Sequence, residues 1–276
     1  MPGYDLHSHS NRSDGTLAPT DVMRLASSRE LAGVALTDHD TFDGLEEAAG
    51  AATDLGLDLV PGIEFSAEYD DASLHILGYW VDADDAAIEA ELVRLTATRF
   101  RRGEMIVEKL RDLGFDISVE RVLELAGGEA IARPHIAAAM VEAGIVADEQ
   151  EAFDRYISDD GLAYVPKHAL HPTQALRLIG DAGGVCVLAH PGMWRGSDTV
   201  PDALIEEMAA GGMAGLEVFH PDHDEGSRAK YAAMAERLDL VATSSSDCHG
   251  ARYGYRMGQE RTDPETFVEL KRRAGR

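Results

Sequence analysis

Histidine and carboxylate residues follow several short apolar runs of this 276-residue chain, and both types bind divalent cations. The first group is His7-Ser8-His9. Side chains alternate between the two faces of an extended strand, so both imidazoles can reach one metal ion. Asp14 follows in the turn at residues 11–15, which is rich in small residues. Because an isolated His-x-His pair is often a coincidence on a surface, the group needs partners elsewhere in the chain.

A second group follows the apolar run 33–36. It consists of His39 with Asp38 and Asp40 on either side. We expect Asp40 to cap a helix that begins at residue 41, because Asp is a favoured N-cap residue. We expect Asp38 to accept a hydrogen bond from a neighbouring imidazole. The group therefore adds a further imidazole beside the end of a strand.

The remaining candidates lie beside other apolar runs, where each could also be an ordinary hydrogen-bonded residue in a turn. They are Glu64, His75, His190, Asp247 and His249. Barrel enzymes gather their functional groups at the carboxyl ends of strands, so the joint pattern favours one shared site. Nitrogen and oxygen ligands without thiolates are typical of Mn, Fe or Zn sites.

The elements that must position these residues alternate between strand and helix, as parallel βα units do. The strands are predicted at residues 4–6, 33–36, 57–63, 74–79, 185–189, 215–219 and 240–243. The helices between them are predicted at residues 20–30, 42–55, 172–181, 201–210, 225–237 and 264–273. This alternation predicts an α/β fold, and it favours a barrel over an open sheet.

The stretch at residues 83–164 has a different texture, with continuous helix formers and no strand pattern. Shorter helices are predicted there at residues 119–125, 134–142 and 149–156. We therefore predict that residues 1–82 and 165–276 form the barrel, which carries the metal-binding catalytic site. Residues 83–164 would form an inserted all-helical domain that caps the substrate.

Charge and composition exclude some classes of protein. The chain has 50 Asp and Glu residues against 25 Lys and Arg residues, a formal net charge of −25. Binders of long nucleic acids neutralise phosphates with Lys and Arg, so we expect no such partner, although a local cationic pocket still allows nucleotides as substrates. The two cysteines, Cys186 and Cys248, give no disulfide framework. No long apolar run or signal-like start occurs, so we expect a cytoplasmic protein without a membrane partner.

Taken together, the motifs resemble those of the polymerase and histidinol phosphatase (PHP) family of metal-dependent phosphoesterases. The segments that carry the resemblance are Asp5-Leu6-His7-Ser8-His9, Ser13-Asp14-Gly15, Thr37-Asp38-His39-Asp40, Gly62-Ile63-Glu64, His75-Ile76-Leu77-Gly78, Ala189-His190-Pro191-Gly192 and Ser246-Asp247-Cys248-His249-Gly250. The resemblance implies a distorted (β/α)7 barrel that binds two or three divalent ions, with Mn preferred over Fe or Zn.

The resemblance also implies a set of ligands for each ion. The first ion would be held by His7, His9, Glu64 and Asp247, the second by Asp14, His39 and His249, and the third by His75 and His190 with Glu64 as a bridge. Many members of the family carry His where this chain has Asp14, so the second site departs from the common pattern.

The insertion resembles that of the branch that dephosphorylates AMP or nucleoside 3′,5′-bisphosphates, through Ala132-Arg133-Pro134-His135-Ile136. This implies that Arg133 and His135 act in catalysis and bind the substrate phosphate, a role that suits the planar donor fork of Arg. The same residues also fit a simple helix start with proline in the first turn. Lys167 and His223 are further candidate substrate contacts, although solvated loop positions suit His223 equally.

These features predict a metal-dependent phosphomonoesterase, in which a hydroxide held between metal ions attacks the phosphorus of a small substrate, preferably a nucleotide. Two alternatives remain. One is an amidohydrolase-type C–N hydrolase, because such barrels also begin with His-x-His and end with an Asp after a strand. The other is a non-catalytic metal- or nucleotide-binding regulatory module, which would require the loss of ligands.

Overall fold

The computed structural model describes residues 2–70, 72–127, 131–158, 160–165, 169–193 and 200–276. The chain divides into two compact units. We call Met1–Glu89 with Ala169–Arg276 the barrel unit, and Ala90–His168 the insertion unit. The first division falls within the helix α3, Ala86–Asp112, rather than before it as expected, because this long helix starts in the barrel unit and continues into the insertion unit.

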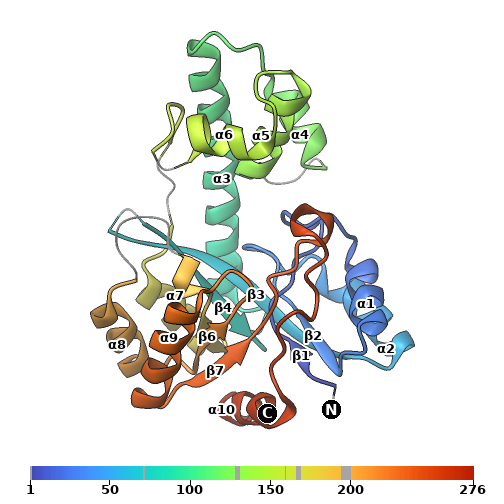
Figure 1. Cartoon of the computed structure of the whole chain (residues 1–276), viewed down its shortest axis with the longest axis vertical. Helices are drawn as coiled ribbons and strands as arrows, with labels where there is room; N and C mark the ends of the chain where they lie inside the picture. Colours follow the sequence, from blue (N-terminus) through green and yellow to red (C-terminus); the bar gives the residue numbers. More distant parts are fainter. Residues whose placement is uncertain (1, 71, 128–130, 159, 166–168, 194–199) are drawn as a thin grey trace. The chain divides into compact units, whose positions relative to one another are not determined.

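A seven-stranded sheet forms the barrel unit, and its strands follow one another in sequence order (Figure 1). They are β1 (Tyr4–Asp5), β2 (Gly33–Leu36), β3 (Asp58–Tyr69), β4 (Ala72–Tyr79), β5 (Val185–Leu188), β6 (Gly215–Phe219) and β7 (Val241–Ser244). Beyond β1 and β7, a parallel bridge joins Ser8 to Cys248, and the His9 amide donates to the Cys248 carbonyl at 2.9 Å. These contacts nearly close the sheet, which confirms the predicted α/β barrel.

The pair β3 and β4 departs from the predicted parallel pattern. These strands pair antiparallel with each other, and β4 also pairs antiparallel with β5. Extended backbone continues to Tyr69, whereas the predicted strand ended at residue 63. Glu64 and His75 therefore lie inside strands rather than at strand ends. The register pairs Glu64 with Leu77 and Ser66 with His75, so Glu64 and His75 share one face of the sheet.

The helices of the barrel unit lie around the strands (Figure 1). They are α1 (Pro19–Ser28), α2 (Leu45–Leu55), α7 (Pro172–Asp181), α8 (Asp202–Ala210), α9 (Glu225–Arg237) and α10 (Pro264–Arg273). Side chains of Asp224 and Asp263 accept hydrogen bonds from first-turn amides of α9 and α10. Such caps satisfy amide groups that have no partner within the helix, which explains why these two helices begin where the sequence predicts.

The predicted cap at Asp40 is wrong. The helix α2 begins at Leu45, and Asp40 adopts a left-handed backbone conformation with φ of 52°. Its Oδ1 atom accepts a hydrogen bond from the Ser66 amide at 2.8 Å, while its amide donates to the Glu64 carbonyl at 3.1 Å. Asp40 therefore ties the end of β2 to the middle of β3, because this long-range pairing prevails over the local capping preference.

The described residues of the insertion unit form helices joined by turns and loops, with no strand among them. Beyond α3 it contains α4 (Val119–Leu125), α5 (Arg133–Glu142) and α6 (Glu149–Ala152), and α6 continues into a π-helical turn, η1 (Phe153–Ile157). It has its own core of buried side chains, among them Val107, Leu110, Ile136, Met140 and Ile157. Across the described residues of both units, no helix is long and apolar enough to cross a lipid bilayer.

Asp5 links β1 to two distant segments of the barrel unit, so its replacement tests how the barrel is held together. The buried carboxylate accepts hydrogen bonds from the Ser246 amide at 2.9 Å and the Gly258 amide at 2.8 Å, one at each oxygen. In Asp5→Asn the side-chain NH2 must face one of these amides. We expect a loss of about 1–3 kcal/mol in the free energy of unfolding, measured by urea denaturation.

The matched control for this prediction is Asp58→Asn. Asp58 is exposed, and its carboxylate accepts a hydrogen bond from the Tyr4 hydroxyl at 3.0 Å. A surface substitution of this kind should change the free energy of unfolding by less than about 0.5 kcal/mol. Equal stability of the Asp5 variant and this control would show that the Asp5 bonds do not hold the barrel together.

Candidate metal centre

The nine predicted metal ligands come together in the barrel unit. Their nitrogen and oxygen atoms form four overlapping groups in which the ligand atoms lie within 4.8 Å of one another. The groups are His9, Asp14, His39 and His249; His7, Glu64 and His190; His7, His9 and Asp247; and His39, Glu64 and His75. Each group combines imidazole nitrogens with carboxylate oxygens, a donor set that suits a divalent cation.

Glu64 is the residue on which these groups converge. Its side chain is 1% exposed. One oxygen, Oε2, lies 3.1–3.2 Å from nitrogens of His7, His9 and His39. The other, Oε1, lies 2.9 Å from His75 Nδ1 and 3.3 Å from His190 Nε2. A carboxylate whose two oxygens face different imidazoles has the geometry to bridge two cations.

Several buried atoms of the cluster point to a cation rather than to hydrogen bonding. The Nε2 atom of His7, both ring nitrogens of His9 and the Oδ1 atom of Asp247 form no hydrogen bond with any described residue. Nevertheless, Asp247 Oδ1 lies only 3.3 Å from His7 Nε2 and 3.1 Å from His9 Nε2. Each unsatisfied buried polar group costs about 1–3 kcal/mol. A divalent cation between these lone pairs would satisfy several at once, so the residues fit the implied metal.

Mutual electrostatics shift the pKa values of the cluster strongly. Burial lowers the pKa of His9, but the Asp247 and Glu64 carboxylates outweigh burial and raise it to about 10. Burial raises the pKa of Asp14, but the imidazoles of His249 and His39 hold it well below its usual value. These carboxylates therefore favour a positive charge beside them. An imidazole must be neutral to bind a metal ion. Metal binding therefore displaces any proton that gives these imidazoles a positive charge.

Asp38 supports the site differently from our expectation. Its carboxylate accepts hydrogen bonds from the Ser10 amide at 2.8 Å and from the hydroxyls of Ser10 and Ser13, both at 2.7 Å. The Asp38 carboxylate accepts no hydrogen bond from the imidazole of any described residue. Asp38 therefore fixes the loop that carries Asp14, because the short loop places three donors around one buried carboxylate.

His223 is a predicted substrate contact, and its side chain is buried. Its Nδ1 atom lies 2.8 Å from the Val218 carbonyl, and its Nε2 atom accepts a hydrogen bond from the Gly192 amide at 3.1 Å. The main chain therefore engages both ring nitrogens. The neighbouring His220 is fully buried, and its Nε2 atom lies 3.8 Å from Asp247 Oδ2. It faces the cluster more directly than His223 does.

Arg133 and His135 lie at the start of α5 in the insertion unit. Arg133 Nη1 donates to the Ile157 carbonyl at 3.2 Å, and the guanidinium lies 5.8 Å from the centre of the Phe153 ring. His135 is 8% exposed, and its Nδ1 atom accepts a hydrogen bond from the Ala132 amide at 3.2 Å. The predicted helix start is therefore present. The remaining predicted contact, Lys167, lies outside the described residues.

Glu217 lies in the middle of β6, outside the set of predicted site residues. Its carboxylate is fully buried, and it contacts His7 Nδ1, the His190 amide and the Ser245 hydroxyl. Burial raises the pKa of Glu217, but His7 and neighbouring imidazoles outweigh burial and lower it to about 2. The available signal was a carboxylate inside the apolar run Gly215–Phe219, where a charge is unfavourable unless it has partners.

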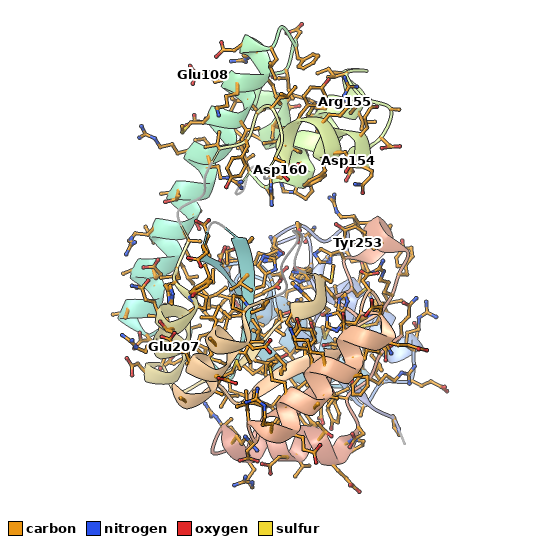
Figure 2. The ribbon with its side chains drawn as sticks, turned by 60° about the vertical axis from the view of Figure 1, so that its left-hand side comes forward. Glu108, Asp154, Arg155, Asp160, Glu207 and Tyr253 are labelled. Carbon is orange, nitrogen blue, oxygen red and sulfur yellow. The ribbon has the colours of Figure 1, made fainter. Side chains whose placement is uncertain are left out.

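A cationic and aromatic segment follows the predicted ligand His249 directly. It is the short helix η3, Gly250–Tyr253, on which Arg252 Nε donates to the Asp14 carbonyl at 3.2 Å. The Tyr253 ring packs edge-on against the His249 ring at 5.4 Å and is 51% exposed. Tyr253 is labelled in Figure 2. The segment therefore places a guanidinium and an aromatic face beside the ligands.

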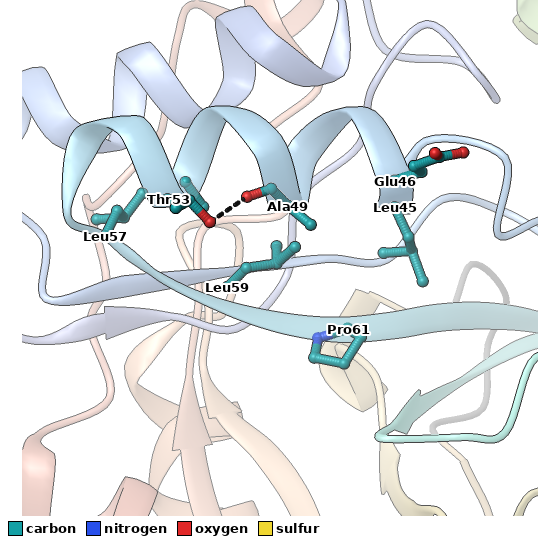
Figure 3. A pocket seen from close by; sticks show the side chains of 8 residues that line it. Leu45, Glu46, Ala49, Thr53, Leu57, Leu59 and Pro61 are labelled. Carbon is teal, nitrogen blue, oxygen red and sulfur yellow. Dashed lines mark hydrogen bonds between the residues drawn. The ribbon is translucent and has the colours of Figure 1, made fainter.

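An apolar pocket of roughly 480 Å³ lies between α2 and β3 (Figure 3). Its lining includes Leu45, Leu57, Leu59 and Pro61, and the Thr53 hydroxyl donates to the Ala49 carbonyl at 2.9 Å. None of the predicted metal ligands lines this pocket. Chemistry on phosphate needs charged groups, so we place the candidate site at the metal cluster and not here.

Comparison with known proteins gives the family. The PHP domain matches this chain over residues 5–156. The chain belongs to the PHP family. It is 34% identical over 257 residues to a 3′,5′-nucleoside bisphosphate phosphatase of Chromobacterium violaceum, covering 93% of this chain and 90% of the relative. It is 32% identical over 246 residues to a 5′-3′ exoribonuclease of Haemophilus influenzae, covering 89% of each chain.

Two solved structures resemble the PHP chain over nearly its whole length. A protein of Bifidobacterium adolescentis described as a metal-dependent phosphoesterase gives a TM-score of 0.93 at 34% identity, covering 99% of this chain and 96% of the other. The second is a protein of Chromobacterium violaceum described as an amidohydrolase, with bound sulfate and no metal. Its TM-score is 0.89 at 33% identity, and the match covers 98% of this chain and 96% of the other. The family, the relatives and the fold together identify this chain as a metal-dependent phosphoesterase, which confirms the predicted family and the hydrolysis of phosphate esters.

The metal content of variants tests whether the cluster is divided into separate metal sites, of which Asp14 serves one and Glu64 serves more than one. Among the imidazoles of the described residues, those of His9, His39 and His249 lie 3.1–3.9 Å from Asp14, whereas Glu64 contacts five. We therefore expect Asp14→Ala to lose Mn²⁺ from one site and Glu64→Gln to lose more. The measurement is Mn²⁺ per chain after dialysis, by plasma mass spectrometry. Asp43→Ala, at an exposed position, should match wild type. Equal metal content in the Asp14 and Glu64 variants would contradict this division into separate metal sites.

Proposed function

We propose that this PHP phosphoesterase is a phosphomonoesterase for small phosphorylated metabolites, and for nucleotides in particular: AMP or a nucleoside 3′,5′-bisphosphate. The observation that supports this most strongly is the buried cluster around Glu64, with its four overlapping ligand groups. Divalent cations held there, preferably Mn²⁺, would lower the pKa of a bound water and neutralise phosphate oxygens. Phosphate hydrolysis then needs no nucleophilic side chain.

The ligand residues would also give the site its charge. We assign His7, His9, Glu64 and Asp247 to the first of two or three cations. We assign Asp14, His39 and His249 to the second, and His75, His190 and the second oxygen of Glu64 to the third. The three carboxylates contribute about −3, so three divalent cations would leave the site net positive at about +3. A locally positive site explains how a chain with a net charge of −25 would bind a phosphate.

Substrate recognition is assigned to cationic and aromatic residues. Arg133 offers a planar fork of donors that matches two phosphate oxygens, and His135 would supply a further contact from the same helix start. The relative that acts on 3′,5′-nucleoside bisphosphates supports a nucleotide over other phosphates. Arg252 and Tyr253 support it as well, because a guanidinium and an aromatic ring suit a phosphate and a base.

The runner-up function is hydrolysis of a phosphodiester in RNA, which is favoured by the exoribonuclease relative. The negative charge of the chain argues against long RNA, because long nucleic acids would be repelled. The C–N hydrolase alternative has support in the description of one structural neighbour, whereas both curated relatives act on phosphate esters. The non-catalytic alternative would require missing ligands, and every expected ligand is present.

An activity assay with variants tests the proposal. Purified protein with Mn²⁺ should release phosphate from AMP or adenosine 3′,5′-bisphosphate. His7→Ala or Asp247→Asn should abolish the release, because each removes a member of the ligand group His7, His9 and Asp247. Phosphate is measured by a colorimetric assay, with Asp43→Ala as the active control. Wild-type turnover in both ligand variants would refute the metal assignment.

The same preparation distinguishes the alternative functions. Nucleotide release from short oligoribonucleotides without phosphate release from AMP would favour hydrolysis of RNA. Turnover of amides would favour the C–N hydrolase.

Arg133 has a separate test. We expect Arg133→Ala to lower kcat/KM for AMP by about 10- to 100-fold, the loss of one or two charged hydrogen bonds. Arg121→Ala is the matched control, because Arg121 belongs to the same unit but pairs with the exposed Glu124 and Glu142. Steady-state kinetics measure both variants. An unchanged kcat/KM in Arg133→Ala would remove Arg133 from the substrate site.

A further inference from the structure

A single buried carboxylate, that of Glu217, contacts two of the assigned metal ligands from behind. Its Oε1 atom lies 3.2 Å from His7 Nδ1 and also accepts a hydrogen bond from the Ser245 hydroxyl. Its Oε2 atom accepts a hydrogen bond from the His190 amide at 2.7 Å. The Glu217 side chain is fully buried and lies in none of the four ligand groups. It therefore touches the metal centre only through other residues.

From these contacts we infer that Glu217 is a positioning residue, which sets the tautomer of His7 and the backbone of His190 so that both can bind metal. The inference rests on the proposed role of these two histidines as ligands. Metal-binding histidines commonly donate their other ring N–H to a carboxylate, which fixes the ring and makes it a better ligand. Glu217 occupies this place behind His7.

The tautomer of His7 follows from its two contacts. Glu217 is an acceptor at His7 Nδ1, so the proton of the neutral ring lies on Nδ1 and the lone pair lies on Nε2. That Nε2 atom is 3.2 Å from Glu64 Oε2 and 3.3 Å from Asp247 Oδ1, and it forms no hydrogen bond with any described residue. The lone pair of His7 is therefore directed at the position where a cation would bind.

The backbone of His190 needs the same carboxylate. His190 has φ of 24°, a left-handed conformation that is unfavourable for a residue with a side chain. The hydrogen bond from its amide to Glu217 Oε2 holds this conformation just after β5. Its ring then reaches Glu64 Oε1 at 3.3 Å. Strain of this kind persists only where the surroundings impose it, and Glu217 is the buried group that does so here.

The substitution Glu217→Gln tests this inference sharply, because a main-chain amide always donates. The oxygen of the new carboxamide must therefore face the His190 N–H, and its NH2 group must face His7 Nδ1. His7 would then carry its proton on Nε2, the atom that faces Glu64 and Asp247. A protonated nitrogen does not bind a cation, so a side chain of unchanged size would remove one metal ligand.

The experiment compares Mn²⁺ binding to the metal-free full-length chain by isothermal titration calorimetry. We expect Glu217→Gln to weaken the tightest Mn²⁺ site by about 10- to 100-fold. Ser245→Ala is the matched control, because it removes a donor to the same Oε1 atom without changing the tautomer of His7. Its Mn²⁺ affinity should change by less than that of Glu217→Gln. Thermal melts of the metal-free variants report folding separately.

Glu217→Ala distinguishes positioning from packing. If Glu217 only fills space, the Gln variant should bind Mn²⁺ like wild type and the Ala variant should bind it more weakly. If Glu217 sets the tautomer, the Gln variant should bind Mn²⁺ at least as weakly as the Ala variant. Wild-type affinity in Glu217→Gln would overturn the inference. If the Gln variant does not fold, wild-type affinity in Glu217→Ala would overturn it instead. Failure of the wild-type chain to bind Mn²⁺ would count against the proposed function.

Discussion

The structure depends on the burial of carboxylates and imidazoles inside the barrel. Charged groups are expensive to remove from water, and each must gain hydrogen bonds or an opposite charge in return. The central carboxylate, Glu64, gains five imidazole contacts within 3.3 Å. Some nitrogens and oxygens around it are still without hydrogen bonds to the described residues, and cations are the partners that suit them. The same groups that are costly to bury therefore define the candidate metal centre.

Carboxylates outside the assigned ligand set hold the loops that carry the ligands. Asp5 binds amides of the segments at Ser246 and Gly258, and Asp38 binds the loop before Asp14. Glu217 contacts the His7 ring after β1 and the His190 amide after β5. Metal sites need ligands that are fixed before the metal arrives, because each freely moving side chain loses entropy on binding. The buried hydrogen bonds provide this order, and they also help to close the sheet.

The overall charge and the local charge of the chain have separate causes. The excess of acidic residues gives a net charge of −25, although the assigned ligands include only three carboxylates, Asp14, Glu64 and Asp247. Most of the excess therefore lies outside the metal centre. Exposed charges are screened by salt within about 10 Å, whereas charges in a buried site are screened much less. A locally positive metal centre is thus compatible with an acidic chain.

The sequence by itself determined the order of strands and helices and which histidines and carboxylates form the candidate metal cluster, because these follow from local patterns: apolar runs, strand alternation and short motifs such as His7-Ser8-His9. Only the tertiary structure decided the antiparallel pairing of β3 with β4, the bond from Ser66 to Asp40, and the role of Glu217. Each of these depends on partners far apart in the chain. A buried carboxylate is stable only where such partners meet it, and a local pattern does not contain them.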